Sequence, residues 1–131
     1  MKDVEKSNRF GREWPKPNPA KKERLLQILG DEIKIAEEQA KLARTQQAAG
    51  AAGPQAALRA DLEVLSLKRE RAALEGDSGR VRGSIADQIR VLYEMEKVMR
   101  EEEKKGVASE AEALQIRRQI LSLQRQQAQM E

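Results

Sequence analysis

The chain has 131 residues, of which 36% are charged, 39% apolar and only 2% aromatic, and its 25 basic and 22 acidic residues give a formal net charge of +3. Enrichment in Ala, Leu, Glu, Gln, Lys and Arg favours helices, and so few aromatic residues give little support to a β-sandwich or barrel. The absence of His and Cys removes the usual general base, the common zinc ligands and a thiol nucleophile. We therefore expect an all-α protein that is not an enzyme and has no cofactor or metal.

The first predicted segment, residues 1–18, is a flexible basic arm. Gly11, Pro15 and Pro17 interrupt it, and its apolar residues have no helical period. Residues 1–24 contain 8 basic and 4 acidic groups, so the arm and its junction with the first helix are the basic part of the chain. The side chains that could bind a partner here are Phe10, Arg12, Trp14, Lys16, Lys21, Lys22 and Arg24.

Three interpretations of this arm are open. Basic side chains beside aromatic rings suit nucleic acid or another anionic surface, because they release counterions and offer a stacking face. Alternatively, Trp14 folds back to cover the end of the helical assembly while the lysines stay solvated. A third interpretation makes Phe10 to Pro19 a linear motif for another protein, held extended by its three regularly spaced prolines.

The second predicted segment, residues 19–76, is a helical hairpin. Asn18 followed by Pro19 predicts a capped helix start, Gly50 predicts its end, and Gly53 with Pro54 predicts a tight restart. Apolar residues then recur at intervals of three and four. In the first helix they are Leu26, Leu29, Ile33, Ala36, Ala40 and Ala43, with Ile28, Ile35 and Leu42 widening the face as if for a second neighbour. In the second helix the rows are Leu58, Leu62 and Leu65, and Ala60, Val64, Leu67 and Leu74.

The third predicted segment, residues 77–131, is another hairpin. Glycines from Gly76 to Gly83 predict a flexible joint, after which Ser84 and Asp87 resemble a capping pair. Gly106 predicts the next helix end, and Ser109 with Glu112 forms a capping box. The expected core residues are Ile85, Ile89, Leu92, Met95, Met99, Ala113, Ile116, Ile120, Leu123 and Met130, flanked by Val91 and Val98. Met95 and Met99, with Tyr93 nearby, could alternatively form a pliable docking surface, but we favour core filling.

The two hairpins are copies of one another. Residues 24–75 recur at 80–131 with an offset of 56, and 16 of 52 aligned positions are identical. Two such units predict a four-helix, up-and-down assembly in which wide apolar faces close on each other or on a second molecule. We expect either the other hairpin or a second molecule to cover four representative positions: Ile33, Leu65, Ile89 and Leu121. A closed monomer, an exchanged dimer and a longer stack all satisfy this requirement.

The second reversal has a counterpart in a known family. The segment from Gly106 to Leu114, followed by a helix rich in Leu and Gln, resembles the helical hairpins of TolC-type outer-membrane efflux proteins, which also contain an internal repeat of paired helices. Copy one differs, with Gly53-Pro54 in place of Ser109-Glu110, and the chain has no strands like those that this family inserts into the membrane. The resemblance therefore implies hairpins that pack and dock, and does not extend to channel activity.

The dense acidic clusters are Glu37-Glu38 and Glu101-Glu102-Glu103, and both lie within pairing distance of basic residues. We interpret them as solvated, ion-paired helix faces and not as catalytic carboxylates. No run approaches the ~18 apolar residues of a membrane span, and no apolar stretch follows Met1 as in a secretory signal. We expect a cytoplasmic protein, or an envelope-associated one if the chain is cut from a longer exported protein.

Together these features predict a non-enzymatic helical-hairpin protein used for protein interaction or oligomeric scaffolding, with self-association as the first expected partnership. The alternative is nucleic-acid or anionic-surface binding through residues 9–24.

Overall fold

The computed structural model describes residues 18–131, and these form four long helices. The helices are α2 (Pro19–Ala48), α3 (Pro54–Leu74), α4 (Ser78–Lys104) and α5 (Glu110–Gln129). No strand occurs within this range. The predicted all-α class and the two tandem hairpins are confirmed, whereas most of the expected arm, including Phe10, Arg12, Trp14 and Lys16, lies outside the described residues.

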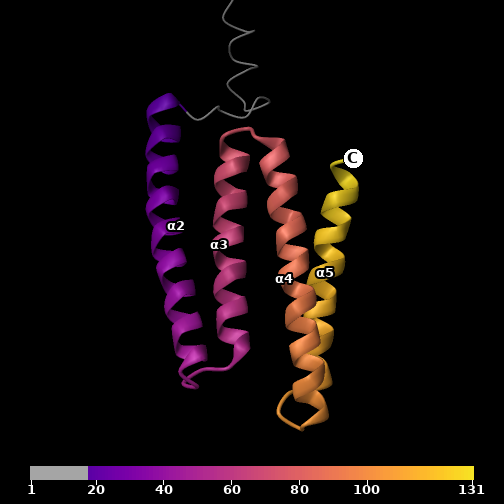
Figure 1. Ribbon diagram of the computed structural model, residues 1–131. Coiled ribbons are helices and arrows are strands. Elements are labelled where there is room, and N and C mark those ends of the chain that lie inside the picture. Colours follow the sequence, from indigo (N-terminus) through magenta and orange to yellow (C-terminus); the bar gives the residue numbers. More distant parts are fainter. Residues whose placement is uncertain (1–17) are drawn as a thin grey trace, which may run out of the picture.

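The helices run alternately up and down, each next to its predecessor in the chain (Figure 1). Helix α3 packs between α2 and α4, and α5 packs against α4. Within the described part of the chain, α2 contacts α3 and none of the other helices. The assembly is therefore an open layer with α2 and α5 at its two edges, rather than a bundle closed by a contact between the first and last helices.

Most of the predicted helix boundaries are confirmed, and local chemistry explains them. Asn18 accepts a hydrogen bond from the amide of Lys21 at 2.7 Å, and Ser109 accepts one from the amide of Glu112 at 3.3 Å. Each bond satisfies an amide that has no partner within the helix. Gly50 and Gly106 end α2 and α4 with φ of 78° and 75°, in the left-handed region that favours glycine. At the start of α3, Pro54 follows Gly53, which supplies no side-chain cap.

The predicted start of the third helix is wrong. The helix α4 begins at Ser78, where the side chain of Asp77 accepts a hydrogen bond from the amide of Arg80 at 3.1 Å. Ser84 therefore lies inside the helix and caps nothing. Two glycines, Gly79 and Gly83, lie in these extra turns, where each glycine costs up to ~1 kcal/mol relative to alanine. The same turns place Val81 against the core, which opposes part of that cost.

The core is unevenly divided between the two hairpins. The larger cluster joins α4 and α5 through the residues Ile85, Ile89, Leu92, Met95, Met99, Ala113, Ile116, Ile120 and Leu123. Leu58 and Leu62 of α3 pack against it. The smaller cluster joins α2 and α3 through Ala36, Ala40 and Val64, with Ala60 and Leu67 beside them. The predicted rows of α3 thus face two different neighbours, and the two methionines fill the core.

Candidate interaction surfaces

An exposed apolar stripe runs along α2, and at its N-terminal end Ile28 borders a hollow that Leu74 of α3 also lines. Ile28, Ile35 and Leu42 are 48%, 61% and 57% exposed. Their spacing of seven residues places them on one line along the helix, beside the row through Leu29 and Ile33 that is buried against α3. The sequence predicted this widened face correctly, but the second neighbour that it suits is absent from the described part of the chain.

A second apolar stripe lies on α5. Its inner row packs on α4, while Leu114 and Leu121 are 52% and 56% exposed. Leu121 is not covered within the described chain, because α5 has a helix on its α4 side and none on this outer side, so of the two expected covers only a second molecule is left for it. Of the other three positions expected to be covered, Ile33 and Ile89 are buried and Leu65 is half-buried.

The two stripes occupy equivalent places at opposite edges of the layer. In the first copy of the repeat, 56 residues earlier, the positions equivalent to Leu114 and Leu121 are Leu58 and Leu65 of α3, both of which are half-buried. In the second copy, the positions equivalent to the α2 stripe are Ser84, Val91 and Val98 of α4, which are also half-buried. Positions that are partly covered in the middle of the layer are therefore exposed at its edges.

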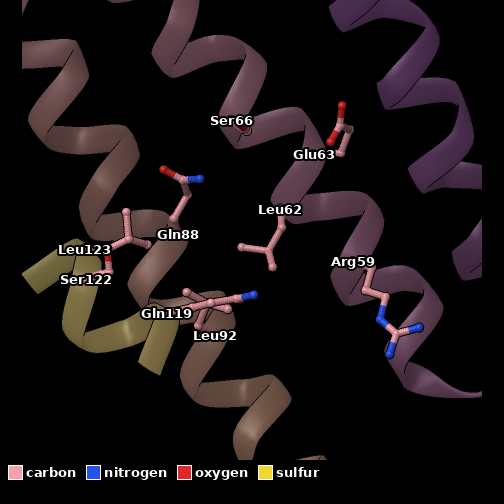
Figure 2. A pocket seen from close by; sticks show the side chains of 9 residues that line it. All are labelled: Arg59, Leu62, Glu63, Ser66, Gln88, Leu92, Gln119, Ser122 and Leu123. Atoms are coloured by element: carbon pink, nitrogen blue, oxygen red, sulfur yellow. The ribbon is translucent and has the colours of Figure 1, made fainter. Parts of the chain in front are cut away.

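A shallow groove runs between α3 and α5 along α4. Its central hollow, of about 350 Å³, is drawn in Figure 2, where Leu62 reaches into the space from α3 and Gln119 and Leu123 from α5. Gln88 is buried at this hollow, and its side-chain oxygen has no hydrogen-bond partner within the described residues. Arg69 donates a hydrogen bond to Gln126 at 3.1 Å and so links α3 to α5 across the groove.

The buried carboxylate Glu96 is held within the second hairpin. Its two oxygens accept hydrogen bonds from Nε and Nη2 of Arg117, both at 2.8 Å. The same guanidinium lies 5.5 Å from the centre of the Tyr93 ring, whose hydroxyl accepts a hydrogen bond from Gln124 at 3.2 Å. Because both carboxylate oxygens bind the guanidinium, this pair fixes the register of α5 on α4.

Each acidic cluster contributes one surface ion pair. Glu103 pairs with Arg100 at 3.2 Å, as expected from their spacing, whereas Glu37 pairs with Lys68 of α3 at 3.4 Å and not with a neighbour on its own helix. A further pair joins Arg44 to Asp61. Within residues 18–131, no three acidic side chains converge into a group that could hold a metal ion.

Part of the predicted binding arm belongs to α2. Lys21, Lys22 and Arg24 lie in its first two turns, and neither Lys21 nor Arg24 is buried. No acidic residue occurs in the first turn of this helix. The positive end of the helix dipole therefore carries further positive charge, an arrangement that an anion would relieve.

Comparison with known proteins gives no relative for this chain. No family model, curated protein or solved structure matches it. The resemblance of its second reversal to the TolC-type hairpins therefore stays a prediction. Of the helices that the structure describes, none combines the length and apolar character required to cross a membrane.

Proposed function

We propose that this chain is a non-enzymatic interaction protein that binds other polypeptides through the outer faces of its edge helices. The observation that supports this most strongly is the pair of exposed stripes on α2 and α5. Scattered exposed leucines are ordinary on protein surfaces, but here five large aliphatic side chains fall on two lines, each spaced by seven residues. Such lines suit another helix.

The mechanism is burial of aliphatic rows against a partner helix. Full burial of a Leu or Ile side chain is worth about 1.5 to 3 kcal/mol, and each side chain of the stripes is already partly covered by its own helix, so each contributes less. Several such contacts along a helix of 20 or 30 residues are needed for a stable complex. Charged residues beside the stripes then select the partner and its orientation.

Site-specific photo-crosslinking in the cells that make the protein tests this proposal. A photoreactive amino acid is placed at Ile35 or Leu121, and at exposed Lys41 outside the α2 stripe as the matched control. We expect protein adducts from the two stripe positions and few from Lys41. Adducts that form equally from all three positions, or from none, contradict the proposal.

A second candidate function, binding of nucleic acid or an anionic surface through residues 9–24, is supported by the basic start of α2. The triple variant Lys21→Gln/Lys22→Gln/Arg24→Gln should weaken binding to an oligonucleotide or to anionic vesicles, and binding by the unaltered chain should fall steeply with salt. The variant Lys97→Gln/Lys104→Gln/Lys105→Gln has the same net charge and should bind like the unaltered chain. Equal effects of the two triple variants would reject a localised site.

A further inference from the structure

We infer that the partner of each edge is a second copy of this chain, with the α2 stripe of one copy docking on the α5 stripe of another in the geometry of the internal α3–α4 contact. This inference rests on the proposed function and specifies its partner. It follows from the internal repeat, because the repeat contains one contact between consecutive hairpins and leaves both halves of an equivalent contact exposed at the edges.

The α5 half of this contact retains the residues that α3 uses. Leu58, Leu65 and Ala72 follow one another at seven-residue intervals on α3; Leu58 packs against the α4–α5 cluster, and Ala72 is 2% exposed beside α4. Their equivalents on α5 are Leu114, Leu121 and Ala128, so all three residue types are identical, yet all three are exposed. Helix α5 thus presents the face that α3 uses to bind α4, with nothing bound to it in the described chain.

The α2 half is apolar at each corresponding position. On α4 the corresponding positions are Val81, Ser84, Val91 and Val98, all of them half-buried, and Val81 and Ser84 line hollows shared with α3. Their equivalents on α2 are Leu25, Ile28, Ile35 and Leu42, all of them exposed and each larger and more apolar than its counterpart. Larger aliphatic side chains bring no advantage to a face that stays exposed to solvent. On a face that packs against a row of leucines they bury more apolar surface area.

Charge complementarity favours the head-to-tail arrangement. Inside the chain, Leu62 of α3 and Gln88 of α4 line the same hollow. Shifting both by one repeat gives Arg118 on α5 and Glu32 on α2, which have opposite charges. Both are exposed, and neither forms an ion pair within the described residues. Docking in the internal geometry would bring them together across the interface.

The same charges disfavour symmetric pairing of identical stripes. Two α2 helices paired antiparallel about Ile35 would place Glu32 opposite Glu38 of the other copy, and a parallel pair would place Glu32 opposite Glu32. Like charges that face each other oppose association and suppress the wrong arrangement. The favoured interface is therefore heterologous, and each added copy leaves one α2 stripe and one α5 stripe free to bind again.

Two single-edge variants of the full chain test this inference. Ile28→Glu/Ile35→Glu disables the α2 stripe, and Leu114→Arg/Leu121→Arg disables the α5 stripe; because all four positions are exposed, both variants should remain folded, as helical circular dichroism can verify. In analytical ultracentrifugation, the unaltered chain should grow in mass with concentration, and each variant alone should remain monomeric. An equimolar mixture should form a heterodimer and nothing larger, since each variant retains the stripe that the other lacks.

The charged pair provides an independent measurement in the same background. In the mixture, Arg118→Glu on the chain that supplies α5 should weaken heterodimer formation roughly tenfold, and Glu32→Arg on the chain that supplies α2 should restore it. Failure of the second change to rescue the first would overturn the proposed register.

Two outcomes would overturn the inference as a whole. An unaltered chain that stays monomeric at all concentrations has no self-interface, and an α5 variant that still dimerises alone would show symmetric pairing through α2. If the chain is monomeric while the stripe positions crosslink to a different protein, the proposed function stands and the second copy is the wrong partner. A monomeric chain without crosslinks would reject both.

Discussion

The two hairpins have the same topology but different interiors. At equivalent positions, the second hairpin buries Leu92 and Ile120 where the first has Ala36 and Val64. Small residues let α2 lie close to α3 but remove little apolar area from water. The two copies therefore share the path of the chain but not the size of the core. Most of the buried apolar side-chain volume lies in the second hairpin and in the face of α3 that packs on it.

This contrast assigns different roles to the helices. Helix α4 has packed neighbours on two sides and is an interior element of the layer, whereas α2 is attached to α3 alone within the described residues. We therefore expect α2 to open locally at a lower free energy than the other helices. The four predictions below test this asymmetry, in order of decreasing effect.

The largest effect is expected from a cavity in the second hairpin. Ile120 is fully buried between α4 and α5, so Ile120→Ala should lower the free energy of unfolding by about 2–5 kcal/mol, measured by urea denaturation. The equivalent change in the first hairpin, Val64→Ala, deletes two methyl groups at a less packed site and should cost about half as much. Equal costs would mean that the two cores contribute alike.

Breaking the buried ion pair should have the next largest effect. Arg117→Ala leaves the 8% exposed Glu96 without its partner and should cost about 1–3 kcal/mol of stability. The double variant Glu96→Leu/Arg117→Met, which removes both charges, should recover most of this loss. As the control in the first hairpin, Arg44→Ala breaks a solvent-exposed pair and should cost at most ~1 kcal/mol.

Hydrogen exchange can compare the helices directly in the unaltered chain. Amides in the middle of α2, around Ile33, should exchange at least roughly tenfold faster than those around Ile89 in α4, because local opening of an edge helix exposes less apolar area. The measurement belongs at a concentration where the chain is monomeric, since docking of a second copy on α2 would slow its exchange. Uniform protection across the helices would contradict the asymmetry.

The smallest effects are expected at the two hairpin reversals. Ser109→Ala removes the side chain that caps α5 and should cost about 0.5–2 kcal/mol. Gly53→Ser introduces a hydroxyl at the uncapped start of α3, where the backbone is extended and no atom obstructs a new Cβ, and should gain a few tenths of a kcal/mol. Thermal unfolding of both variants should therefore shift in opposite directions.

Much of the fold could be predicted from local sequence signals. Asn18, Ser109 and the two turn glycines Gly50 and Gly106 act within a few residues of their own positions, so their effects can be derived without the tertiary structure. The helical periods likewise gave the buried rows. The start of α4 could not be derived this way, because the value of two extra turns depends on Val81 meeting a core built from distant residues.

The surfaces were harder to predict than the core. The spacing of Ile28, Ile35 and Leu42 indicated a face for a second neighbour, but no local signal says whether that neighbour is in the same chain. The inference that this neighbour is a second copy of the chain came from comparing the burial of residues related by the 56-residue offset. The pairing of Glu96 with Arg117 was also missed, because it depends on the register between two helices and the first copy has Ala40 and Asp61 at these places.

The short connection between α3 and α4 has a further consequence. Only Glu75, Gly76 and Asp77 separate the two helices, and a tether this short acts like a partner present at roughly millimolar concentration. A contact of the same strength between separate molecules has no such tether and forms only as the protein accumulates. An assembly that grows by repeating the α3–α4 contact between molecules would then lengthen as the concentration of the chain in the cell rises. The rates of synthesis and degradation of the chain would set that length.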